Sequence, residues 1–145
     1  MRLCGEMELP NGLRLQFWDE SRPIAGDRWY AGLRAVLAVE IPPEATRPEL
    51  GEGLQLLKEA LGPVVYYQRL MERHFVARQD VPSVLREMRE SFLANSLGYL
   101  SHKDFPARFL LAKAGELQKK RNWGQQYVEK VLEELRPPQS PRAEG

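Results

Sequence analysis

Apolar and polar residues alternate most regularly between Trp29 and Ile41, where every odd-numbered position is apolar and the even-numbered positions form a mixed set. A period of two places alternate side chains on opposite faces of a β-strand. The pattern therefore predicts a long strand with one fully buried side. Two prolines at 42–43 end it, because proline has no backbone N–H for a β ladder.

A β-hairpin is predicted ahead of this strand, over residues 6–19, around the Pro-Asn-Gly sequence at 10–12. A three-residue loop ending in a left-handed glycine pairs Met7 with Leu15 and keeps one face of the hairpin apolar. A two-residue Asn-Gly loop would mix the faces, so we expect the longer loop. Trp18 then points away from the apolar face.

The segment that joins the hairpin to the long strand, residues 21–27, contains Pro23 and Gly26 and is predicted to be a loop. Beyond the strand, a helical stripe is predicted up to Leu61, where Gly-Pro stops it. Residues 64–77 also fit a helical stripe, but their Val-Val-Tyr-Tyr start and alternating apolar positions favour a strand.

Helical patterns fill the C-terminal part of the chain. One helix begins at Asp80 and is predicted to end near Gly98, and another opens at Pro106. A last amphipathic helix follows Trp123, either separate or continuous with the one before it through a bend at 122–124. The tail, residues 137–145, contains three prolines and is expected to be disordered.

These elements predict the α+β class, as one domain over residues 1–136. We expect an antiparallel sheet of about four strands with helices packed mainly on one face. The order along the chain is three strands, a helix, a strand and three helices.

Composition excludes several classes of protein. The 145 residues carry 21 Lys and Arg against 20 Asp and Glu, so no global field would attract nucleic acid or anionic membranes. Cys4 is the single cysteine and there are two histidines, which favours a reducing, cytoplasmic setting and leaves too few ligands for a typical zinc site. No membrane-spanning segment, metal or cofactor is predicted.

The leading functional hypothesis is a small non-enzymatic binding or adaptor domain. Large aromatic residues recur on the side of the predicted sheet opposite the core, and such residues are enriched in protein interfaces. The partner would be another protein or a second copy of the chain. The candidate binding residues are Trp18, Arg22, Asp27, Arg28, Tyr30 and Tyr66.

Two other functions stay open. Arg22, Asp27 and Arg28 could hold a small polar ligand or substrate on their loop, or could simply tie the loop down through ion pairs. Cations beside aromatic residues could bind nucleic acid, although adjacent positions in a helix point in different directions. The residues for that alternative are Arg69, Arg73, Lys119, Lys120, Arg121 and Trp123. The sequence contains no catalytic motif that we recognise, and no catalytic residue is predicted.

Overall fold

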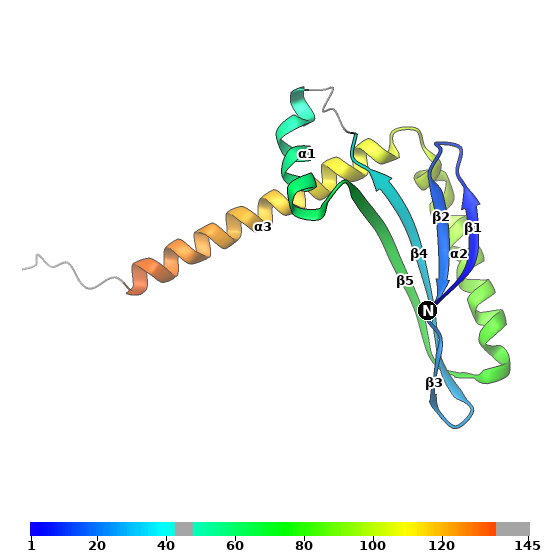
Figure 1. Ribbon diagram of the computed structural model, residues 1–145. Helices are drawn as coiled ribbons and strands as arrows, with labels where there is room; N and C mark the ends of the chain where they lie inside the picture. Colours follow the sequence, from blue (N-terminus) through cyan, green and yellow to red (C-terminus); the bar gives the residue numbers. More distant parts are fainter. Residues whose placement is uncertain (43–47, 136–145) are drawn as a thin grey trace, which may run out of the picture.

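The computed structural model describes residues 1–42 and 48–135. One antiparallel sheet contains β1 (Arg2–Glu8), β2 (Arg14–Asp19), β3 (Arg22–Ala25), β4 (Arg28–Glu40) and β5 (Val64–Ala77). The helices are α1 (Pro48–Leu61), α2 (Val81–Ser101) and α3 (Phe105–Leu135), with a 3₁₀ turn at Arg78–Asp80. The α+β class and the antiparallel sheet are confirmed (Figure 1).

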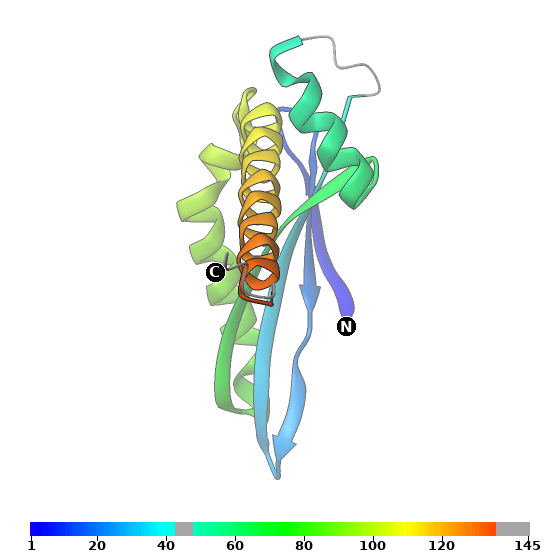
Figure 2. The same cartoon turned by 90° about the vertical axis from the view of Figure 1, so that its left-hand side faces the viewer.

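The long strand β4 is the centre of the sheet. Along one of its edges it pairs with β5 over almost its whole length, and along the other with β3 near its start and then with β2. The strand β1 is added outside β2. Helices α2 and α3 lie on the same side of this sheet (Figure 2), and α1 contacts α3 and β5.

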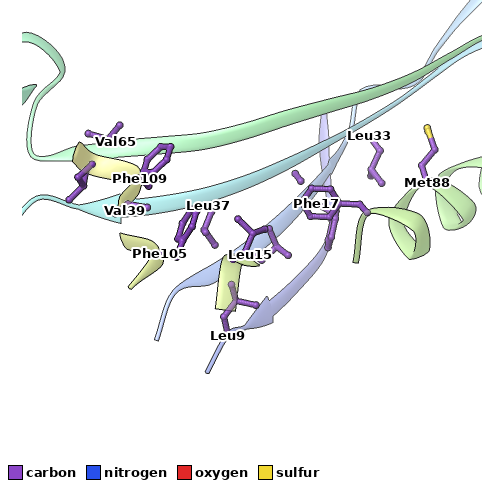
Figure 3. Packing of buried hydrophobic residues seen from close by; sticks show 14 of the residues in the cluster. Leu9, Leu15, Phe17, Leu33, Leu37, Val39, Val65, Met88, Phe105 and Phe109 are labelled. Atoms are coloured by element: carbon purple, nitrogen blue, oxygen red, sulfur yellow. The ribbon is translucent and has the colours of Figure 1, made fainter. Parts of the chain in front are cut away.

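The hydrophobic core forms on the odd-numbered side of β4, as the alternation predicts. Leu33, Ala35, Leu37 and Val39 are almost completely shielded from solvent there. Phe17 of β2 and Phe105 and Phe109 of α3 lie in this core (Figure 3). Phe17 packs edge-on against Phe92 of α2, and the two α3 rings pack against Tyr67 of β5. Burial of this apolar surface is the main force that holds helices and sheet together.

The first hairpin has the predicted register. Met7 lies opposite Leu15, the backbone closes through a Leu9 N to Leu13 O hydrogen bond of 2.7 Å, and Gly12 has a φ of +88°. The amide of Asn11 in the loop donates to the carbonyl oxygen of Leu100 at 2.7 Å. The loop is therefore attached to the end of α2.

The prediction of a loop over residues 21–27 was wrong in part. Residues Arg22–Ala25 form β3, and only Gly26 and Asp27 turn the chain into β4. Gly26 makes this tight turn with a φ of +58°, and Pro23 is tolerated because β3 is an edge strand. The sheet accordingly has five strands instead of about four.

The end of α2 differs from the prediction, because this helix continues past Gly98 to Ser101. The glycine at position 98 costs only about 1 kcal/mol, which is not enough to end α2 there, because Leu100 beyond it is packed in the core. Of the two alternatives for residues 122–124, the structure has the continuous one, in which α3 runs through them without interruption. The order of strands and helices matches the predicted pattern. The strand at 64–77 is confirmed, while residues 137–145 lie outside the described residues.

The contact between Tyr30 and Gly32 of β4 gives a first testable prediction. A Cβ atom at Gly32 would lie 2.7 Å from a carbon of the Tyr30 ring, which is itself buried. Gly32→Ala should therefore lower the free energy of unfolding by about 1–3 kcal/mol, measured by urea denaturation. The matched control is Gly98→Ala, a helical site with no neighbour within 4 Å, which should be neutral or stabilising. Equal stability of Gly32→Ala and the native protein would contradict this packing.

Candidate functional site

The side of the sheet opposite the core carries the even-numbered side chains of β4 and β5. We name this side the open sheet face, because no described helix packs on it. It contains a shallow depression of about 640 Å³. Its lining residues include Gln16, Trp18, Glu20, Arg34, Val36, Tyr66 and Gln68. The face is therefore a broad surface accessible to another macromolecule.

Charged groups on the open sheet face neutralise one another. The guanidinium of Arg34 donates to both carboxylate oxygens of Glu20, with 3.2 Å between Nη2 and Oε1, and also to the side-chain oxygen of Gln68 at 3.2 Å. The hydrogen bonds to Glu20 raise the pKa of Arg34. Hydrogen bonds from Gln16 and Arg14 lower the pKa of Glu6 nearby. Because these charged groups are paired with one another, the aromatic side chains are the groups of this face that we consider for binding.

The expectation that Tyr30 is an exposed aromatic residue was wrong. Only 6% of the residue is exposed. Its ring covers Gly32, the guanidinium of Arg22 lies 5.0 Å above the ring, and the His74 ring lies 5.2 Å away. The hydroxyl donates to Glu72 at 2.6 Å, and burial together with this carboxylate raises the pKa of Tyr30 to about 12. Tyr30 stabilises the junction of β3, β4 and β5.

Trp18 and Tyr66 are brought together on the open sheet face. Tyr66 is 53% exposed, and the partly exposed Trp18 donates from Nε1 to Gln16 at 3.2 Å. Both residues line the same depression although 48 positions separate them in the chain. They are the part of the predicted aromatic set that is available for contact.

The three charged residues predicted for a ligand loop lie on the β3–β4 hairpin. Asp27 and Arg28 form an exposed ion pair of 3.9 Å at the hairpin tip, and Arg22 covers the Tyr30 ring. Asp27 and Arg28 therefore pair with each other at the surface, while Arg22 contacts an aromatic ring of the next strand.

The residues predicted for nucleic-acid binding lie on two separate elements. Arg69 and Arg73 of β5 line a hollow against α2, where Arg73 pairs with Glu87 at 3.6 Å. Lys119, Lys120 and Arg121 are exposed on α3. The side chain of Trp123 lies outside the described part of the structure. The structure does not join these cations into one basic surface.

A feature that the sequence analysis missed is the direction of α3. Its first part, through Leu117, packs against the core, whereas residues 118–135, here named the α3 extension, continue away from the sheet (Figure 1, orange). Val128, Leu132 and Leu135 on the extension are 54%, 58% and 74% exposed. Their amphipathic spacing predicts the helix but not that its apolar side is uncovered.

Comparison with known protein families, with curated proteins and with solved structures finds no match for this chain. Among residues 1–42 and 48–135, no cluster of three His, Cys, Asp or Glu side chains is arranged to hold a metal ion. No helix in these ranges is long and apolar enough to cross a membrane.

The environment of Tyr30 predicts a distinct alkaline titration. Because its folded-state pKa, about 12, exceeds the ordinary value of 10, its contribution to stability is complete below pH 10 and is lost as pH rises toward 12. Ultraviolet titration should show one of the five tyrosines ionising late, near pH 12. Tyr30→Phe should remove this late step and reduce the loss of stability between pH 10 and 12, whereas Tyr66→Phe should retain both. A late step that persists in Tyr30→Phe would contradict the assignment.

Proposed function

We propose that this protein is a non-enzymatic protein-binding module that associates with a second copy of itself through the α3 extension. The observation that carries the proposal is the exposed apolar side of a helix that extends beyond the domain. Val128, Leu132 and Leu135, each more than half exposed, follow the 4-3 spacing of a helix-pairing seam. A reducing cytoplasmic setting is part of the same proposal.

The α3 extension has little to stabilise it within one chain. Eighteen residues form about 27 Å of helix, and isolated helices of this length are marginal in water. Gly124 lowers helix propensity further. Glu133 and Glu134 occupy the last turn, where the helix dipole favours cations. A partner that supplies positive charge at this end and covers the apolar side would correct each deficit.

A second copy supplies that charge in a register set by the helix itself. If two extensions overlap completely and antiparallel, residue 118 lies level with residue 135 of the other copy. Lys119 is then level with Glu134, and Lys120 with Glu133. Because the pair has two-fold symmetry, both basic runs meet an acidic end, and the charges at the two ends of the interface are complementary. Parallel pairing would instead place like charges side by side, so the charge pattern favours the antiparallel dimer.

Charge reversal and rescue test this interface. Sedimentation of the native chain should show a monomer–dimer equilibrium, since an interface of two single helices is small and of low affinity. Lys120→Glu and Glu133→Lys should each weaken the dimer by about tenfold, and the double variant should restore it, because the two charges exchange places across the pair. Leu132→Glu should abolish association.

The control for the charge reversals is Lys58→Glu on the exposed end of α1, which should leave the dimer unchanged. A native chain that stays monomeric at hundreds of micromolar, or a double variant that does not recover, would refute the self-association. The same double variant separates this function from nucleic-acid binding. If Lys120 bound a nucleic-acid phosphate, Lys120→Glu would weaken that binding, and the added Glu133→Lys change would not restore it.

The open sheet face is the candidate surface for a different protein partner. Trp18 and Tyr66 flank Val36 in its depression, and Arg34 beside them is already paired with Glu20, so a partner need not supply a counter-charge there. Aromatic anchors of this kind contribute a large share of the binding energy in protein interfaces. A dimer formed through the α3 extension would present two open sheet faces, one from each copy.

Alanine substitution tests the aromatic anchors. Trp18→Ala and Tyr66→Ala should each weaken binding of a purified partner by about 2 kcal/mol, measured by calorimetry after the partner is recovered with the native chain. Both variants should retain the native dimer constant and near-native stability, while Leu132→Glu should retain partner binding. Unchanged affinity in both aromatic variants would exclude the open sheet face as the binding surface.

A further inference from the structure

A hollow of about 630 Å³ lies on the core side of the sheet, between the start of α2 and the ends of β1 and β2. We name it the arginine hollow because its wall contains Arg2, Arg78, Arg86 and Arg89. Its apolar lining comes from Trp29 and Leu33 of β4 and from Val81, Pro82 and Leu85 of α2. The hollow is of the size that small-molecule sites have.

The arginine hollow has an excess of positive charge. Asp19 is its one carboxylate, and Asp19 pairs with Arg2 at 3.3 Å. Within the described part of the chain, Arg78, Arg86 and Arg89 form no salt bridge within 4.0 Å. Three arginines thus line one hollow without an anionic partner within 4.0 Å from these residues.

Packing holds one of these guanidiniums in place. The Arg89 side chain lies over the Phe17 ring, with 4.9 Å from its Cζ atom to the ring centre. A Cβ atom at position 5 would lie 2.7 Å from the Arg89 Nη1 atom, so the glycine there makes room for the guanidinium. A guanidinium that is already positioned loses less conformational entropy when it binds an anion.

We propose that the arginine hollow binds an amphipathic organic anion, with a carboxylate or phosphate group on an apolar body. Guanidiniums bind both groups through paired N–H donors, and the proposed ligands of the anion are among Arg78, Arg86 and Arg89, which all line the hollow. The apolar body would lie against Leu85 and Leu33, where its burial adds the hydrophobic term. We therefore expect tight binding only from a ligand that has both the anionic group and the apolar body.

Cys4 provides a local reporter for occupancy. It is the single cysteine of the chain, it lines the arginine hollow, and its thiol donates to the carbonyl oxygen of Phe17 at 3.4 Å. Burial and the Asp19 carboxylate raise the pKa of this thiol above its ordinary value of 9.0. An anion bound beside it would shield the sulfur and slow its alkylation.

The test uses four probes with the full-length protein: octyl phosphate, octanoate, octanol and inorganic phosphate. Calorimetry should show octyl phosphate and octanoate binding at least about tenfold more tightly than octanol or inorganic phosphate. Comparison of the first two ranks phosphate against carboxylate. At saturation, both should slow alkylation of Cys4 by N-ethylmaleimide, and the two single-feature probes at the same concentration should not.

Substitutions then assign the binding to the arginines. Arg78→Gln and Arg86→Gln, both at exposed positions, should each weaken octyl phosphate binding by about tenfold without a change in stability. Arg14→Gln on the opposite side of the sheet is the matched control and should have no effect. Octanol binding as tightly as octyl phosphate, Cys4 alkylation unaffected by either anion, or an equal loss in Arg14→Gln would each overturn the proposal. Leu132→Glu should bind octyl phosphate normally, which separates this site from self-association.

Discussion

The structure depends on the burial of one side of β4. Leu33, Ala35, Leu37 and Val39 must leave water together because they share one face of a continuous strand, and β2 and β5 extend the apolar surface to both sides. Helices α2 and α3 cover that surface. Arg86 and Arg89 of α2 line the hollow beside this core, and α3 runs on beyond β5, away from the sheet (Figure 1).

Two surfaces of the described chain stay uncovered in this arrangement. The other side keeps its polar network, in which Arg34 and Glu20 neutralise each other, and it leaves Trp18 and Tyr66 as accessible aromatic residues. The core in turn is too short for the 31 residues of α3, so the α3 extension is left with an apolar side that nothing within the described chain covers. Neither surface takes part in the packing of the hydrophobic core.

The sequence was informative wherever local periodicity decides the structure. The strand at 64–77, the buried side of β4 and the hairpin register at 10–12 follow from alternation and from a glycine that must turn. Long-range contacts decided the rest. Tyr30 is buried because Arg22 and Glu72 reach it from neighbouring strands, and no pattern within β4 encodes that. Likewise, no local sequence pattern reveals that arginines from distant parts of the chain line the same hollow.

Hydrogen exchange along the chain tests the central claim most directly, that the α3 extension is completed by a second copy. At high protein concentration the amides of residues 118–135 should exchange slowly, and dilution below the dimer constant should make them exchange fast, because a lone helix of this length opens readily. The amides of β4 should exchange slowly at both concentrations. Exchange in the extension that does not depend on concentration would contradict the account.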